Sequence, residues 1–162
     1  MRSLVAIPLV ALALAAAACG GGDPTFAALR QSTVEEVPGT WGLVLRPPPN
    51  DLAPKVTPAR ARAIAFAQRP PGQVLETLAL VPGSFVGTRH ESPAWVVFAR
   101  DLCYAQSKGD LVSSSRRDPN DVQRCSDRNL WVTMIDPASG LRLSSVGAYD
   151  TTGRWTPARG SA

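Results

Sequence analysis

The chain of 162 residues has one histidine, three cysteines and few aromatic residues, which make up 6% of it. A catalytic triad or dyad would need the single histidine, His90, beside an activated serine, and neither Ser84 nor Ser92 lies in a nucleophile elbow. We therefore expect His90 to be a surface-loop residue. The scarcity of cysteine and histidine also leaves no complete tetrahedral ligand set for a structural metal.

Lysine is nearly absent, because Lys55 and Lys108 are the only two, and most of the positive charge comes from arginine. The formal net charge is +4, and the arginines are scattered along the chain. Scattered charge, together with the export signal described next, argues against a nucleic-acid partner. Anionic lipid headgroups, acidic wall polymers or solvent alone are the alternatives for an arginine-rich surface.

Long apolar runs are also missing, since the uncharged stretch Leu4–Ala18 has 15 residues and a membrane span needs about 20. Arg2 precedes this stretch, which gives it the layout of a secretory signal. Cys19 follows the small residues Ala16 and Ala18 directly. This arrangement resembles the lipobox of bacterial lipoproteins, with Ala16 where Leu or Val is more usual. The resemblance implies that the Cys19 thiol is alkylated by a diacylglyceryl group.

A lipid on Cys19 would hold the chain at the extracytoplasmic face of a cell membrane. A single acyl chain binds only marginally, so lasting attachment needs two or three of them. Residues 20–25 are rich in glycine and are expected to form a flexible tether. Plain secretion after cleavage by an ordinary signal peptidase is the alternative.

The other two cysteines, Cys103 and Cys125, form an even pair in a chain that faces an oxidising exterior. We expect a disulfide between them, which would close a loop of about 23 residues and stabilise the fold by roughly 3 kcal/mol. Two unrelated buried thiols or metal ligands are the alternatives. The bridge would make residues 104–124 a closed protrusion.

A helix is predicted over Pro58–Gln68, because Thr57 can cap its first amides and Pro58 has a backbone torsion that suits the first helical turn. Pro70-Pro71-Gly72 ends it. Its apolar stripe is expected to pack on a sheet. The stripe consists of Ala59, Ala63, Phe66 and Ala67, with Ile64 at its margin.

Strands are predicted from runs of apolar and β-branched residues. Trp95 and Trp131 lie within two of these runs and are expected in the core between the helix and the sheet. Asp136–Gly140 has the composition of a turn and is expected to join the last two strands as a hairpin. The predicted strands are Val74–Val81, Ala94–Leu102, Asn129–Ile135 and Leu141–Val146.

The helix led by Thr57-Pro58, the strand Ala94–Val97 and a final hairpin carrying Asp136-x-x-Ser139-Gly140 together resemble the PepSY-like domains of bacterial envelope proteins. The resemblance implies an α+β fold in which one main helix packs on a small antiparallel sheet of about four strands. It also implies a role in restraining peptidases or in sensing at the cell envelope, with no catalytic motif and no cofactor. The disulfide-closed loop insertion departs from the family pattern.

These observations divide the chain into four expected segments. They are a lipoprotein signal peptide (1–18), a tether and N-terminal arm (19–51), a PepSY-like domain (52–148) and a flexible tail (149–162).

The predicted function is non-enzymatic binding of a protein or peptide partner in the envelope, because loops on rigid scaffolds often carry recognition. The candidate partner contacts are Arg116 and Arg117 at the loop tip and Trp41 and Trp155 near the ends of the chain.

The sequence leaves three alternatives to partner binding. An envelope hydrolase would need His90 to converge with Asp101 or Ser92 in a concave site, and a small-ligand-binding lipoprotein would use the sheet face opposite the helix. A calcium site lacks the glycine and the distal glutamate of the calcium-loop pattern. Its oxygen ligands would be Asp118, Asp121 and Asp127.

Overall fold

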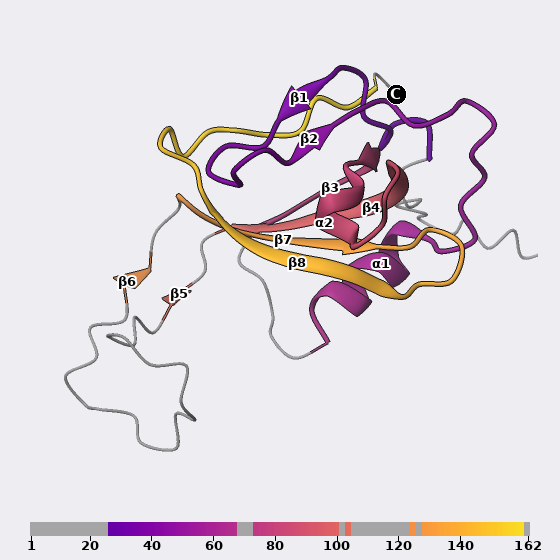
Figure 1. Cartoon of the computed structure of the whole chain (residues 1–162). Helices are drawn as coiled ribbons and strands as arrows, with labels where there is room; N and C mark the ends of the chain where they lie inside the picture. Colours follow the sequence, from indigo (N-terminus) through magenta and orange to yellow (C-terminus); the bar gives the residue numbers. More distant parts are fainter. Residues whose placement is uncertain (1–25, 68–72, 101–102, 105–123, 126–127, 161–162) are drawn as a thin grey trace, which may run out of the picture.

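The computed structural model describes residues 26–67, 73–100, 103–104, 124–125 and 128–160 (Figure 1). At its centre is a four-stranded antiparallel sheet with the order β3-β4-β7-β8. The strands are β3 (Gln73–Val81), β4 (Ser92–Arg100), β7 (Asn129–Ile135) and β8 (Arg142–Tyr149).

Smaller elements surround this sheet. Two short antiparallel pairs are β1 (Glu35–Glu36) with β2 (Val44–Leu45), and β5 (Cys103–Tyr104) with β6 (Arg124–Cys125). The helices are α1 (Pro58–Ala65) and α2 (Gly83–Val86).

The fold is mainly β, so the expected α+β fold with one main helix packed on a sheet is wrong. Within the described residues the helices are short, eight residues in α1 and four in α2. The reason is that α1 covers only part of one sheet face, while the other is covered mainly by the β1–β2 and C-terminal segments together with the one-turn helix α2. The predicted strand positions agree with β3, β4, β7 and β8 to within a few residues.

Helix α1 begins as predicted, because the Thr57 side chain accepts a hydrogen bond from the Arg60 amide at 3.2 Å. The predicted apolar stripe is only partly correct, since Ala59, Ala63 and Ala67 are exposed while Phe66 and Ile64 pack against the core, and the helix ends at Ala65 rather than Gln68. The helix instead turns the side that carries Ala61 toward the sheet. On that side its neighbours in the core are Val56, Leu78, Trp95, Val97 and Ile135.

The turn between β7 and β8 forms as predicted. One oxygen of Asp136 accepts hydrogen bonds from the amides of Ala138 and Ser139, both at 2.7 Å, and Gly140 has a φ of 78°. The backbone hydrogen bond from Ser139 is the largest influence on the Asp136 carboxyl and lowers its pKa. The turn thus has the Asx geometry and the left-handed glycine that its sequence predicts.

The opposite sheet face is covered by β1, β2 and part of the C-terminal segment. Val37, Leu43 and Leu45 are fully buried against this face, and the Trp155 ring packs edge-on against Phe98 with centroids 5.0 Å apart. The core residues contributed by the sheet include Leu75, Ala79, Val81, Val96, Phe98, Val132 and Met134. Residues on both sides of the predicted 52–148 domain therefore complete its core.

The two ends of the described chain lie side by side. Gln31 forms a bridge with Arg159, and the amide of Ser32 donates to the carbonyl of Ala158 at 2.8 Å. The composition after residue 149 predicts a frayed tail, whereas residues 150–160 make these backbone contacts. The partners are more than a hundred residues away in the sequence, so local composition does not reveal them.

Candidate functional site

The turn between β1 and β2 presents Trp41 to solvent. The Trp41 side chain is 98% exposed, and its backbone has a φ of 58°, in the left-handed region that a bulky side chain rarely adopts. Two hydrogen bonds hold the turn in place. The buried Thr40 hydroxyl donates to the Val37 carbonyl at 2.6 Å, and the Val37 amide donates to the Leu43 carbonyl at 2.9 Å. The tryptophan is therefore displayed on an ordered turn.

Gly39 fixes the position of this turn against the end of β8. A Cβ atom at Gly39 would lie 2.5 Å from both the amide nitrogen and the carbonyl oxygen of Tyr149, so no larger residue fits without movement. Gly39 also has a φ of 72°, which glycine adopts without steric cost. Trp41 follows this contact by two residues along the turn, and Tyr149 at the end of β8 is 48% exposed.

Trp131 lies on the other face of the sheet, the face that α1 contacts, because it alternates along β7 with Thr133 and Ile135. It is paired with Gly147 of β8, and its ring atoms lie 3.7 and 3.8 Å from the position of a Cβ on Gly147. Directly paired residues and alternate residues of a strand share a face, so Trp131, opposite Gly147 on β7, and Tyr149, two residues further along β8, lie on one face of the sheet. Trp131 is 36% exposed, so the prediction that it is a core residue is wrong, whereas Trp95 is fully buried as predicted.

We use the name aromatic surface for the exposed aromatic residues at this end of the molecule, namely Trp41 on the β1–β2 turn and Trp131 and Tyr149 on the α1 face of the sheet. In Figure 1 the β1–β2 turn, the end of β8 and the pair β5–β6 all lie toward the left of the molecule, and the C-terminus is on the right. The amide of Gly160 donates to the carbonyl of Arg30, so the first described residues also lie on the C-terminal side. The aromatic surface is therefore at the end of the molecule away from the N-terminal segment.

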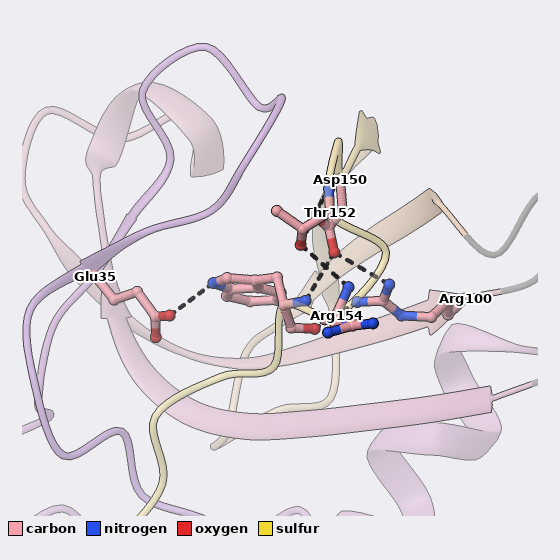
Figure 2. Close-up of polar contacts among 6 residues, drawn as sticks. Glu35, Arg100, Asp150, Thr152 and Arg154 are labelled. Carbon is pink, nitrogen blue, oxygen red and sulfur yellow. Dashed lines mark hydrogen bonds and ion pairs between the residues drawn. The ribbon is translucent and has the colours of Figure 1, made fainter.

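A buried polar network supports this end of the sheet (Figure 2). Arg100 donates from Nη1 to Oδ2 of Asp150 at 3.1 Å, and both side chains are almost fully buried. The Thr152 hydroxyl donates to the other Asp150 oxygen at 2.7 Å, and the Trp155 amide donates to Oδ2 at 2.8 Å. Burial raises the pKa of Asp150, but these hydrogen bonds together outweigh it and lower the pKa to about 2.

Glu35 joins this network to the N-terminal arm. One of its carboxylate oxygens accepts from the Trp155 indole at 2.6 Å, and the other accepts from the Ala158 amide at 3.0 Å and from Gln31 at 3.1 Å (Figure 2). Trp155, a predicted partner contact, is half-buried and is held within the fold by Glu35 and Phe98. Trp41 is the predicted contact that the structure leaves accessible.

The residues considered for catalysis do not converge among the described parts of the chain. His90 and Ser84 are exposed, and Ser92 Oγ contacts the backbone carbonyl of His90 and the Thr88 hydroxyl, each at 3.4 Å. The described residues contain no cluster of three or more metal-ligating side chains. Asp101, the loop residues Arg116 and Arg117, and the calcium candidates Asp118, Asp121 and Asp127 lie outside the described residues.

Cys19 is the predicted lipidation site, and Cys103 and Cys125 are the predicted disulfide partners. Cys19 lies outside the described residues. Cys103 and Cys125 are direct backbone partners in the β5–β6 register, which is the arrangement a cross-strand bridge needs. The disulfide itself remains a prediction.

Sequence reasoning missed Tyr149, and it placed Trp131 in the interior. The available signal was Gly147, a residue without a side chain in an apolar strand, which lies opposite Trp131 and two residues before Tyr149. Glycine inside a strand often marks close packing of a neighbouring group.

No family model, curated protein or solved structure matches this chain. In the described parts of the chain, no helix has the length and apolar character needed to cross a membrane.

Proposed function

We propose that this protein is a lipid-anchored module at the extracytoplasmic face of a bacterial membrane, and that it binds a protein or peptide partner without catalysing a reaction. The observation that carries the binding role is Trp41, an almost fully exposed tryptophan on an ordered turn in the left-handed conformation. The Cys19 sequence context carries the anchoring role.

The placement of Trp41 has a free-energy cost that folding does not explain. Left-handed backbone costs about 1–2 kcal/mol for a residue with a side chain. An exposed indole contributes no burial to the fold, because its apolar area stays in water. Non-glycine residues in this conformation gather at binding and functional sites. Trp41 therefore fits a role outside the core.

Other exposed aromatic residues at this end of the molecule support the same role. Tyr149 and Trp131 add two further partly exposed aromatic side chains at the same end of the sheet. Tryptophan and tyrosine are enriched among the residues that dominate binding energy at protein interfaces. The rigid base of strands and buried hydrogen bonds would keep the ordering cost on binding low.

The location suits a tethered protein. The aromatic surface lies at the end away from residues 30–32, which follow the predicted tether. Anchoring through Cys19 would then leave this end open to partners in the envelope.

Photo-crosslinking in bacterial membranes tests this function. A photo-reactive phenylalanine in place of Tyr149 should give a discrete adduct with a partner, and Trp41→Gly should remove most of that adduct. The same photo-reactive residue in place of Arg60, which is exposed on α1, is the matched control and should not give it. Equal adducts at both positions, or none at Tyr149, would overturn the binding role.

Radiolabelled palmitate tests the anchor separately. The wild-type chain should take up label and stay with the membrane, and Cys19→Ser should do neither. An unlabelled wild-type chain released into the medium would show that the anchoring role is wrong.

A further inference from the structure

The two edges of the central sheet differ. On the β3 edge, the Leu78 amide and carbonyl bond to Leu29 and Gln31, and the Leu80 amide and carbonyl bond to Arg46. The N-terminal arm thus covers this edge. The other edge is β8, which has β7 on one side and no further strand among the described residues.

The register of the β7–β8 ladder shows which backbone groups of β8 point outward. The Asp150 amide donates to the Arg128 carbonyl at 2.8 Å, so these two residues form a hydrogen-bonded pair. Hydrogen-bonded and non-hydrogen-bonded pairs alternate along an antiparallel ladder. Ser145 and Gly147 belong to the non-hydrogen-bonded pairs, so their N–H and C=O groups face away from β7.

Gly39 marks the limit of this open edge. By the same alternation the N–H and C=O of Tyr149 also face outward, and Gly39 lies directly against them. The next two outward positions along β8, Gly147 and Ser145, have no strand partner among the described residues. This open edge is short and adjoins the aromatic surface.

The open part of the edge lacks two common protections against pairing, and a β-bulge at Leu143 limits it on the other side. Natural edge strands carry lysine, proline or inward-pointing charge that blocks an incoming strand. Residues 144–148 of β8 contain no proline and no charged residue. An extended peptide can pair with such an edge through its backbone, while its alternate side chains give specificity.

The side chains beside the open edge indicate what such a peptide would carry. Trp131 and Tyr149 border Gly147 on one face of the sheet. Gly147 itself presents no side chain, so an apolar side chain of an added strand opposite it could reach the Trp131 ring across Gly147 and lie beside Tyr149. Alternate residues of the peptide would thus be apolar.

The charged residues near β8 indicate which charge the remaining side chains of the peptide would carry. Arg142 at the start of β8, which donates to the Ile64 carbonyl at 2.9 Å, and Arg154 beside the end of β8 are exposed. The two neighbouring carboxylates are already engaged, Asp136 by amides of its own turn and Asp150 by Arg100. The edge therefore favours a segment that carries carboxylates. A second copy of this chain would bring the same arginines to the interface and is disfavoured.

We propose that β8 accepts an extended acidic peptide segment as an added strand, paired with the backbone of Ser145 and Gly147 and with apolar side chains over Trp131 and Tyr149. This inference rests on the proposed binding function and specifies the chemistry of the partner.

Hydrogen exchange of the full mature chain in detergent tests the proposal, with a capped peptide of alternating valine and glutamate as the probe. The probe should slow exchange of the Ser145 and Gly147 amides and leave the amides of α1 unchanged. A matched peptide with lysine in place of glutamate should bind at least about tenfold more weakly, equivalent to about 1.4 kcal/mol. A peptide with N-methyl groups on the residues that donate to β8 should not bind.

Two variants of the protein complete the test. Ser145→Pro removes one outward donor at an edge position where proline is tolerated. Ser145→Ala keeps that donor and, like the proline variant, removes the 3.3 Å hydroxyl contact with Thr133. Binding of the probe should be lost in the first variant and retained in the second. If Ser145→Pro does not fold, the N-methyl peptide alone decides.

Three results would overturn the proposal. They are unchanged exchange at Ser145 and Gly147, equal binding of the acidic and basic peptides, and protection that rises with protein concentration in the absence of peptide. The last would assign the edge to a second copy of the chain. A partner adduct at Tyr149 without protection of the β8 amides would overturn strand addition alone. If neither the adduct nor the protection is seen, the binding function is overturned as well.

Discussion

Arg100 and Asp150 form a buried ion pair at 3.1 Å that joins the end of β4 to the segment following β8. Asp150 also accepts hydrogen bonds from Thr152 and Trp155, and the Trp155 carbonyl accepts from Arg100. The pair therefore fixes the chain that follows Tyr149 and, through it, one side of the aromatic surface.

Removal of the Asp150 charge should destabilise the protein strongly. Asp150→Asn leaves the Arg100 guanidinium buried without its counter-charge, so we expect the free energy of unfolding to fall by about 3–5 kcal/mol. Urea unfolding of the purified chain measures this. Glu91→Gln is the control, because it breaks an exposed ion pair with Arg46 and should cost less than about 1 kcal/mol. An equal loss in the free energy of unfolding for both substitutions would contradict the prediction that the buried pair matters more than the exposed one.

The same carboxylate should make stability depend on acidic pH. The pKa of Asp150 is about 2 in the folded protein against an ordinary value of 3.8, so the unfolded state binds a proton first as the pH falls. The associated stabilisation, about 2 kcal/mol, is complete above pH 4 and is lost as the pH falls through 2. Unfolding measured from pH 6 to pH 2 should show this loss in the wild type and a smaller one in Asp150→Asn. Identical profiles would contradict the assignment.

Gly39→Ala should cost more than an alanine at a glycine of the same conformation elsewhere. Gly39 and Gly87 both have a φ of 72°, but a Cβ at Gly39 meets the backbone of Tyr149 at 2.5 Å, while nothing lies within 4 Å of one at Gly87. We expect about 1 kcal/mol of destabilisation for Gly87→Ala and about 2 kcal/mol or more for Gly39→Ala. Thermal unfolding of both variants measures the difference. Comparable losses would show that the turn can move away from β8.

Trp41→Gly should separate stability from binding. Glycine adopts the left-handed conformation of this position without steric cost, and the exposed indole makes no contribution to the core. The free energy of unfolding should stay within about 1 kcal/mol of the wild type, because the strain relieved offsets the extra entropy of the unfolded chain. Partner adducts at Tyr149 should fall sharply. A large loss of stability would assign Trp41 to folding instead.

Local features of the fold were predictable because they depend on neighbours in the sequence. The cap formed by Thr57 and the turn begun by Asp136 are made by hydrogen bonds that span only three residues. The strand positions follow from apolar runs and from turn residues between them. These signals are present in any short window of the chain.

The phase of α1 and the exposure of Trp131 were not predictable in this way. Four apolar or small residues of the predicted helix 58–68 suggest one stripe, but the sheet contacts the side of α1 that carries Ala61. Trp131 lies between buried Leu130 and Val132 in β7 and is 36% exposed. The core on its face of the sheet is built around Trp95, Val97 and Ile135 instead.

The sequence by itself determined the four strands, the helix start, the β7–β8 turn and the expected processing site at Cys19, because each depends on adjacent residues. Only the tertiary structure decided which elements cover the sheet and which aromatic side chains reach solvent. Glu35 bonds to Trp155 across 120 residues, and Gly39 lies against Tyr149. Such contacts depend on how segments distant in the sequence pack against one another, so no short stretch of the sequence predicts them.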